Sequence, residues 1–169
     1  MRRIMLSNNN NDDAVVGMPI YLIVAIVTAS MIIGVLTLSV LKLVNETKQE
    51  EVKTEIEKIV SEAENMFEYA DEGTLVAIHI EFPDSMSFVV FGSMPINGLA
   101  EPNNFKLNEN TSNNYYFVMN DGTLYSFSSN ARFSGKSTDN FAVFKPGNYN
   151  LNLELVKTRG KTYVKVYSQ

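Results

Sequence analysis

The strongest pattern in the chain is an uninterrupted apolar stretch from Val15 to Val44. No charged residue appears in it before Lys42, which leaves roughly 27 uncharged residues where about 20 suffice to cross a bilayer. A helix that is apolar on every face is out of place in the core of so small a protein. The stretch therefore predicts a membrane-embedded helix that contacts lipid over residues 15–44.

A cleavable secretory signal is the first alternative for this stretch. Such a signal has an apolar region of about 7–15 residues that ends at a small-residue cleavage site. The stretch here is longer, and no such site follows Val44. We therefore expect the hydrophobic segment to be retained. Arg2 and Arg3 favour a cytoplasmic N-terminus, which places the C-terminal part of the chain outside the cytoplasm.

Small residues recur within the apolar stretch at a spacing that suits helix packing. Ala25 and Ala29 are four residues apart, and so are Ser30 and Gly34. Small side chains at this spacing let two helices approach closely in lipid or in the core of a filament. These four positions are the predicted helix-packing residues.

Residues 45–72 form a charged segment with one apolar stripe. The stripe consists of Val52, Ile56, Ile59, Val60, Ala63, Phe67 and Ala70. Spacings of three and four predict an amphipathic helix. No proline lies between Ile20 and Gly73, so we expect one continuous helix of about 50 residues, about 75 Å long, that stops near Gly73. Its second part would be a stalk that packs one face on the C-terminal domain. A single-span anchor followed by an amphipathic connector accounts for the same stripe.

From residue 73 to residue 169 the hydrophobic period changes to two, which predicts strands. We expect strands at Val76–Phe82, Met86–Phe91, Tyr115–Met119, Thr123–Phe127, Phe141–Phe144, Tyr149–Leu155 and Tyr163–Tyr167. Asn120-Asp121-Gly122 is a strong hairpin signal, and residues 92–113 are expected to be mostly loop. The predicted fold class is α+β, with a long N-terminal hydrophobic helix followed by a small antiparallel β-sandwich-like domain outside the cytoplasm.

Composition and charge exclude several classes of function. The net charge is −5, and the 14 basic residues are dispersed among 19 acidic ones, which argues against a nucleic-acid partner. The chain has no cysteine and a single histidine, His79, which is expected on the outer face of its strand. No phosphate-binding glycine loop or nucleophile motif is present. We therefore expect no enzymatic activity, no cofactor and no metal site.

Three further features have a functional and a plain structural interpretation. The sequons at Asn45 and Asn110 are candidate N-glycosylation sites, although an Asn-rich chain yields chance matches about as often. The aromatic residues of the predicted hairpin are expected to divide between the core and an outer contact surface. They are Tyr115, Tyr116, Phe117, Tyr125 and Phe127. A basic hairpin tip, interpreted as solvated, consists of Lys157, Arg159, Lys161 and Lys165.

The N-terminus resembles that of archaeal type IV pilin-like proteins. The resemblance rests on the run Asp12-Asp13-Ala14-Val15-Val16-Gly17-Met18-Pro19-Ile20, which leads directly into the apolar helix, and it covers roughly the first 45 residues. It implies a class III signal peptide: a polar leader, residues 1–14, which a membrane peptidase removes. The cut would fall between Ala14 and Val15, or between Gly17 and Met18. Mature subunits of such proteins bundle their helices into a filament core and display β-rich heads.

Two features depart from that family pattern. Lys or Arg usually precedes the cut, whereas this chain has Asp12 and Asp13, and residues 15–24 contain no glutamate like the one near the mature start of bacterial pilins. An uncut, permanently anchored chain is therefore kept as an alternative.

Two hypotheses of function follow. The first is a structural surface protein, a pilin-like subunit or minor pilin, at the cell membrane or in an extracellular filament, whose partners are membrane lipid and other copies or pilin-like subunits. The alternative is a permanently membrane-anchored extracytoplasmic binding module with an unknown ligand.

Overall fold

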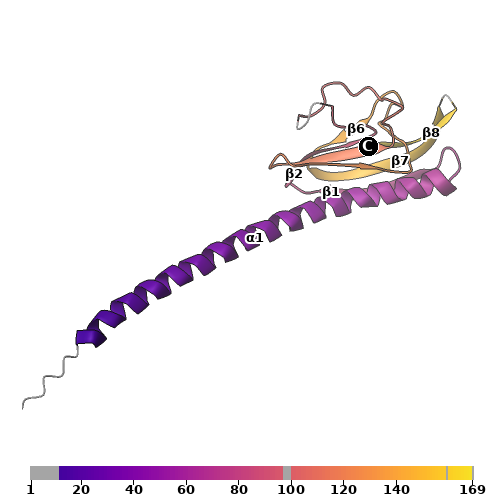
Figure 1. The fold of residues 1–169 in the computed structure, drawn as a ribbon. Coiled ribbons are helices and arrows are strands. Elements are labelled where there is room, and N and C mark those ends of the chain that lie inside the picture. Colours follow the sequence, from indigo (N-terminus) through magenta and orange to yellow (C-terminus); the bar gives the residue numbers. More distant parts are fainter. Residues whose placement is uncertain (1–11, 97–99, 159, 169) are drawn as a thin grey trace, which may run out of the picture. The chain divides into compact units, whose positions relative to one another are not determined.

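The computed structural model describes residues 12–96, 100–158 and 160–168, with side chains from Ile20 onward. One helix, α1 (Asp12–Tyr69, 58 residues), precedes eight strands in this part of the chain (Figure 1). The chain divides into two compact units, Met1–Asn45 and Glu46–Gln169. The first unit contains the apolar part of α1, and the second contains its charged part together with all of the strands.

The strands form two four-stranded sheets. Their bounds are β1 Leu75–Phe82, β2 Met86–Phe91, β3 Asn114–Met119, β4 Leu124–Ser128, β5 Phe133–Ser134, β6 Ala142–Phe144, β7 Gly147–Thr158 and β8 Lys161–Ser168. One sheet has the order β1-β7-β8-β5 and the other has the order β4-β3-β2-β6. All pairings are antiparallel except β5 with β8. The predicted α+β class is confirmed.

β5 was not predicted, and it is also the strand that pairs in parallel. It has only two residues, which is too short for an alternating pattern to be recognised. Its position depends on Phe133, which is fully buried and packs 5.5 Å from the ring of Phe91. A tertiary contact therefore fixes this strand.

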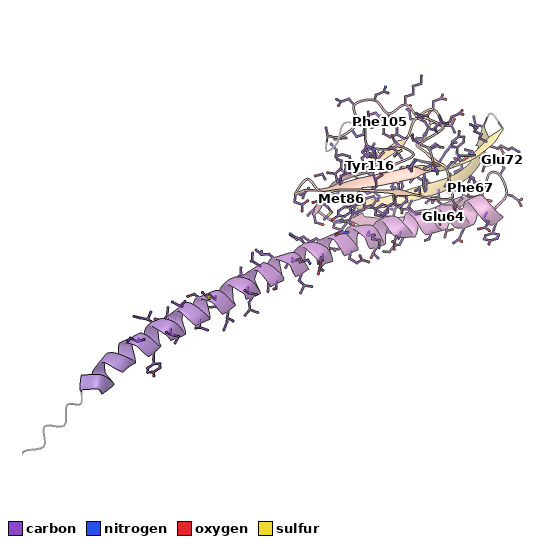
Figure 2. All side chains as sticks on the ribbon, in the orientation of Figure 1. Glu64, Phe67, Glu72, Met86, Phe105 and Tyr116 are labelled. Carbon is purple, nitrogen blue, oxygen red and sulfur yellow. The ribbon has the colours of Figure 1, made fainter. Side chains whose placement is uncertain are left out.

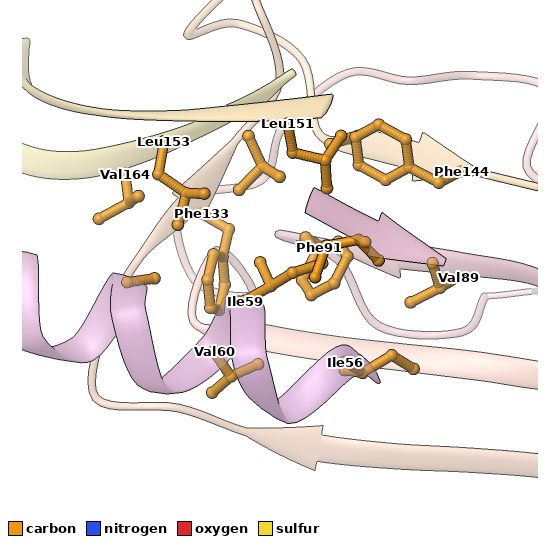
Figure 3. Packing of buried hydrophobic residues seen from close by; sticks show 14 of the residues in the cluster. Ile56, Ile59, Val60, Val89, Phe91, Phe133, Phe144, Leu151, Leu153 and Val164 are labelled. Carbon is orange, nitrogen blue, oxygen red and sulfur yellow. The ribbon is translucent and has the colours of Figure 1, made fainter. Parts of the chain in front are cut away.

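The second unit has one core, which α1 and both sheets share (Figure 3). From α1 this core takes Val52, Ile56, Ile59, Val60, Ala63 and Met66, all of which are buried. Phe67 and Ala70 pack at its margin. The predicted stripe is thus confirmed and gains Met66. Each large side chain buried in this way stabilises the domain by about 1.5–3 kcal/mol, so the helical segment from Glu46 onward is an integral part of the fold.

The sheet that contains β2 is covered on both faces. Val89 and Phe91 point into the shared core, whereas Phe88 and Val90 belong to a second cluster on the opposite face. Leu107, from the long segment between β2 and β3, packs on that second cluster. The described residues of the segment 92–113 are mostly loop, as predicted, and Leu107 of this segment packs on the second cluster.

The helix ends a few residues earlier than Gly73. α1 stops at Tyr69, and Gly73 has a φ of 88° in the turn that leads into β1. The N–H of Gly73 donates to the carbonyl of Leu155 at 2.8 Å, which ties this turn to β7. Glycine adopts positive φ without steric cost, and for this reason the chain can reverse here.

The predicted hairpin at Asn120-Asp121-Gly122 is confirmed and connects β3 to β4. Gly122 has a φ of 84°, and the N–H of Met119 donates to the carbonyl of Thr123 at 2.9 Å. The Asp121 carboxylate accepts the N–H of Thr123 at 2.8 Å. That hydrogen bond lowers the pKa of Asp121 below its ordinary value.

Candidate functional site: the exposed apolar helix

The apolar part of α1 presents an exposed surface over residues 20–44. Every residue from Ile20 to Lys48 is exposed. The large apolar side chains of residues 20–44 have exposed fractions from 43% at Val44 to 77% at Tyr21. Figure 2 shows these side chains projecting on all sides of the ribbon. A surface of this extent is far larger than the apolar patches that soluble monomers expose, which makes it a candidate interaction surface.

The serine and threonine hydroxyl groups in this part of the helix are satisfied internally. Thr28 donates to the carbonyl of Val24 at 2.7 Å, and Ser30 donates to that of Ile26 at 2.8 Å. Thr37 and Ser39 bond the carbonyls four residues earlier in the same way. Because these donors already have acceptors on their own helix, they do not need water, and the segment can enter an apolar medium at low cost.

The predicted helix-packing residues lie on this exposed surface. Ala25, Ala29, Ser30 and Gly34 are all exposed. A Cβ atom added at Gly34 would meet nothing within 4 Å. Packing within the described monomer therefore gives no reason for glycine at this position.

The candidate cleavage positions belong to the first turns of α1. The backbone is helical at Ala14, Val15, Gly17 and Met18. Their side chains, and residues 1–11 of the predicted leader, lie outside the described part of the chain.

Within the described residues, α1 from Ile20 onward is the one helix that is long and apolar enough to cross a membrane. It is a candidate membrane anchor.

The charged part of α1 makes polar contacts with the edge strands of both sheets. On the β4 side, the hydroxyl of Tyr125 donates to Gln49 at 2.8 Å, and the hydroxyl of Ser129 and the N–H of Asn130 donate to Glu64 at 2.7 and 2.9 Å. On the β1 side, the N–H of Glu81 donates to Glu55 at 3.4 Å. α1 therefore covers the β1 and β4 edges of the two sheets.

The aromatic hairpin packs inside its own unit. Tyr116 and Phe117 are buried, and Tyr125 and Phe127 are half-buried at the margin of the shared core. Their rings stack across β3 and β4, with Phe117 and Tyr125 centroids 5.0 Å apart. Burial, together with the nearby carboxylates of Glu57 and Glu64, raises the pKa of Tyr115. Tyr115, Phe117, Tyr125 and Phe127 thus belong to the core shared with α1, and Tyr116 is buried in the second cluster on the opposite face of the sheet.

The two sequons differ in their surroundings. Asn45 is exposed on α1, where Thr47 is also exposed. Asn110 is exposed in a turn, but Ser112 of the same sequon is fully buried and donates to the carbonyl of Glu109 at 2.8 Å. Glycosylation of the chain at Asn45 or Asn110 stays a prediction.

The other residues that the sequence singled out form no catalytic or metal-binding cluster within the described residues. His79 is exposed, as expected, and its Nδ1 lies 2.9 Å from the Oδ1 of Asn150. No group of three or more His, Asp or Glu side chains in this part of the chain is arranged to hold a metal ion. In the predicted basic tip, Lys161 pairs with Glu109 and Lys165 pairs with Glu154. Arg159 lies outside the described residues.

Comparisons with protein-family models, with curated proteins and with solved structures found no match for this chain.

Proposed function

We propose that this chain is a structural surface protein, a pilin-like subunit or minor pilin of archaeal type. The helix over residues 15–44 would anchor it, and the β domain would be displayed outside the cell. The observation that carries the proposal is the exposure of every described side chain from Ile20 to Val44. Lipid and the helices of other subunits are the two environments that can bury such a surface on all sides.

The energetics of insertion support the anchoring step. Residues 20–41 contain thirteen Ile, Leu and Val residues and no charge. Each of these favours insertion by about 0.3–0.6 kcal/mol near the bilayer centre, which amounts to about 4–8 kcal/mol for the segment. At about 1.5 Å per residue these 22 positions extend about 33 Å, close to the thickness of the hydrocarbon core.

Filament assembly would then exchange lipid for protein around the same helix. Hydrophobic burial does not drive this exchange, because lipid is as apolar as the side chains, so close packing must drive it. Ala25, Ala29, Ser30 and Gly34 would permit this close approach. The resemblance of residues 12–20 to pilin-like N-termini points in the same direction.

The decisive experiment is the intact mass of the protein recovered from its native membrane. A mature start at Val15 or Met18 is expected if a leader peptidase processes the chain. Electron microscopy of the same cells should then show filaments that an antibody against the β domain labels. A start at Met1 without filaments would overturn the pilin-like proposal.

A second candidate is the permanently anchored binding module. Asp12 and Asp13 favour it, because they stand where pilin-like leaders usually carry Lys or Arg. An unprocessed N-terminus together with a monomeric state in detergent would support this function, and a processed N-terminus would contradict it.

A further inference from the structure

The edges of the two sheets that α1 leaves uncovered are both short. The strand orders β1-β7-β8-β5 and β4-β3-β2-β6 place β5 and β6 at these edges. β5 ends at Ser134, opposite Lys165, whereas β8 continues to Ser168. The last residues of β8 thus extend beyond the end of β5, and their edge is not paired with that strand. An unpaired strand edge is a template for another extended chain, and natural proteins usually protect it.

One groove joins this end of β8 to the edge of β6. It has a volume of about 580 Å³, and its walls include Ala142–Phe144 and Val166–Ser168. Figure 1 likewise places the C-terminal end of β8 next to β6. The groove lies entirely within the second unit, and Phe105 also lines it. Figure 2 labels Phe105 on the far side of the β domain from Glu64 and Phe67 of α1.

The main-chain N–H and C=O groups of Val143 point outward from the open edge of β6. The N–H of Gly92 donates to the carbonyl of Asn114 on β3, so Gly92 and Val90 direct their main-chain groups toward β3. Because successive residues of a strand alternate in this direction, Val89 and Phe91 form their main-chain hydrogen bonds with β6. Their partners are Phe144 and Ala142. Val143, between these partners, therefore directs its N–H and C=O away from β2. The N–H of Phe141, two residues earlier, already donates outward to the carbonyl of Phe105 at 2.8 Å. No described residue bonds the outward groups of Val143.

The same alternation leaves main-chain groups free on β8. The N–H of Val164 donates to the carbonyl of Arg132 at 2.7 Å, so Val166 and Ser168 also face the β5 side. Ser168 lies beyond the end of β5 and has no partner on that side among the described residues. Two strand edges with unpaired donors and acceptors therefore border one groove.

The groove is lined by apolar and uncharged polar side chains and carries a single charge. Phe105, whose exposed fraction is 41%, packs its ring 5.7 Å from that of Phe141 and presents its free face. Lys136 is the charged residue among those that line the groove, and its Nζ lies 6.0 Å above the Tyr167 ring. Within the described residues it has no carboxylate partner. An occupant that fits this surface is extended, apolar at alternate positions, and carries a carboxylate that reaches Lys136.

We propose that the groove between β6 and the end of β8 is a strand-addition site for an extended peptide segment of a partner protein. The peptide pairs its main chain with Val143, lays apolar side chains against Phe105, and places an acidic residue at Lys136. Recognition by strand addition takes its affinity from main-chain hydrogen bonds and its specificity from side-chain contacts. The proposal does not depend on the proposed filament function.

The test uses the full chain in detergent micelles. The probe is a fluorescent synthetic heptapeptide of alternating valine and threonine with one glutamate, and binding is followed by fluorescence anisotropy. A Val143→Pro variant removes only the outward N–H and keeps the bonds to β2, because proline is tolerated at such edge positions. The matched control is Ala77→Pro, which removes the outward N–H of an exposed residue on β1, the edge strand next to α1, outside the groove.

Saturable binding is expected for the native chain and for Ala77→Pro. Val143→Pro should bind about fivefold more weakly or worse, which corresponds to one lost main-chain hydrogen bond. Lys136→Gln should weaken binding by about two- to fivefold at low salt, the range of an exposed ion pair. A peptide methylated at alternate main-chain nitrogens should not bind.

A second readout protects the test against misfolding of the proline variant. The backbone amide resonances of Val143 and Ser168 in the native chain should shift when the peptide is added. The proposal is overturned if these resonances do not move, if the methylated peptide binds equally well, or if both proline variants weaken binding equally. Self-association through this edge, abolished by Val143→Pro without any peptide binding, would also overturn it in favour of a second copy as the occupant.

Discussion

At the scale of single residues, the surroundings of Gly34 in the monomer do not explain its identity. It lies in a helix, where glycine costs about 1 kcal/mol relative to alanine, and a side chain added there would meet nothing within 4 Å. The structure contains no close contact that requires its small size. A contact with another helix would supply that reason.

Gly34→Leu separates membrane insertion from assembly. Leucine favours both the helix and the bilayer, so insertion should be unchanged or stronger, whereas close approach of a second helix should be blocked. The measurements are membrane fractionation and filament yield by electron microscopy, with the neighbouring Val35→Leu as the control. Filaments at normal yield in Gly34→Leu would remove Gly34 from the predicted packing surface.

Asp121 is a residue whose contribution to stability depends on pH. Its pKa is lowered chiefly by the hydrogen bond from the N–H of Thr123, so the carboxylate stabilises the folded hairpin above the unfolded-state pKa of about 3.8. This contribution is lost as the pH falls through the lower, folded-state pKa.

Asp121→Ala should therefore lower the urea midpoint at pH 7 and have little effect near pH 2. Urea unfolding of the full chain in micelles at several pH values checks this, with Asp84→Ala, at another exposed turn, as the control. A difference between Asp121→Ala and the native chain that does not change with pH would contradict this assignment.

At the scale of elements, the first and second parts of α1 have different surfaces. From Ile20 to Lys48 every residue is exposed, and from Val52 to Met66 one face is buried in the core. The same charged segment also places Gln49, Glu55 and Glu64 against the edge strands of the two sheets. This segment of α1 thus supplies both apolar packing and edge protection to the β domain.

Ile59→Ala tests the packing role of this segment. Ile59 is fully buried, so its truncation should lower the free energy of unfolding by about 2–5 kcal/mol through lost contacts and a cavity. Glu51→Ala, on the exposed face of the same helix, should change it by about 0.5 kcal/mol or less. Urea unfolding followed by circular dichroism measures both. Equal effects of the two substitutions would mean that the stripe does not pack on the sheets.

At the scale of the whole molecule, the division between Asn45 and Glu46 does not coincide with the end of α1. The folded domain includes roughly the last two dozen residues of the helix, because its core takes six side chains from them. The exposed apolar surface lies almost entirely in the other unit. The exposed apolar surface and the packed face are therefore separated within one helix.

Truncation tests this division. A chain of residues 46–169 should be soluble without detergent, monomeric and cooperatively folded, because it retains the complete core. A chain of residues 70–169 should aggregate or stay unfolded, since its sheets would expose Phe82, Phe91, Phe117 and their neighbours. Size-exclusion chromatography and thermal unfolding distinguish the two. Equal stability of both fragments would exclude an integral role for the helix.

The sequence by itself determined the elements whose side chains follow a regular period. The apolar stretch predicted the long exposed helix, the stripe from Val52 to Ala70 predicted the packed face, and alternation along β1 and β7 predicted their inner faces. These patterns are local, because a helix or strand must place its apolar residues on one side to bury them. The exposed apolar helix, as a candidate site, was visible in the sequence for the same reason.

Only the tertiary structure decided the features that depend on distant partners. The parallel pairing of the two-residue β5, the packing of Leu107 on the second cluster and the burial of Phe117 in the core shared with α1 join segments far apart in the chain. The groove between β6 and β8 belongs to the same class, since its walls come from segments far apart in the chain. Strand lengths and sheet edges follow from how the two sheets and α1 share one core, and no local period records that arrangement.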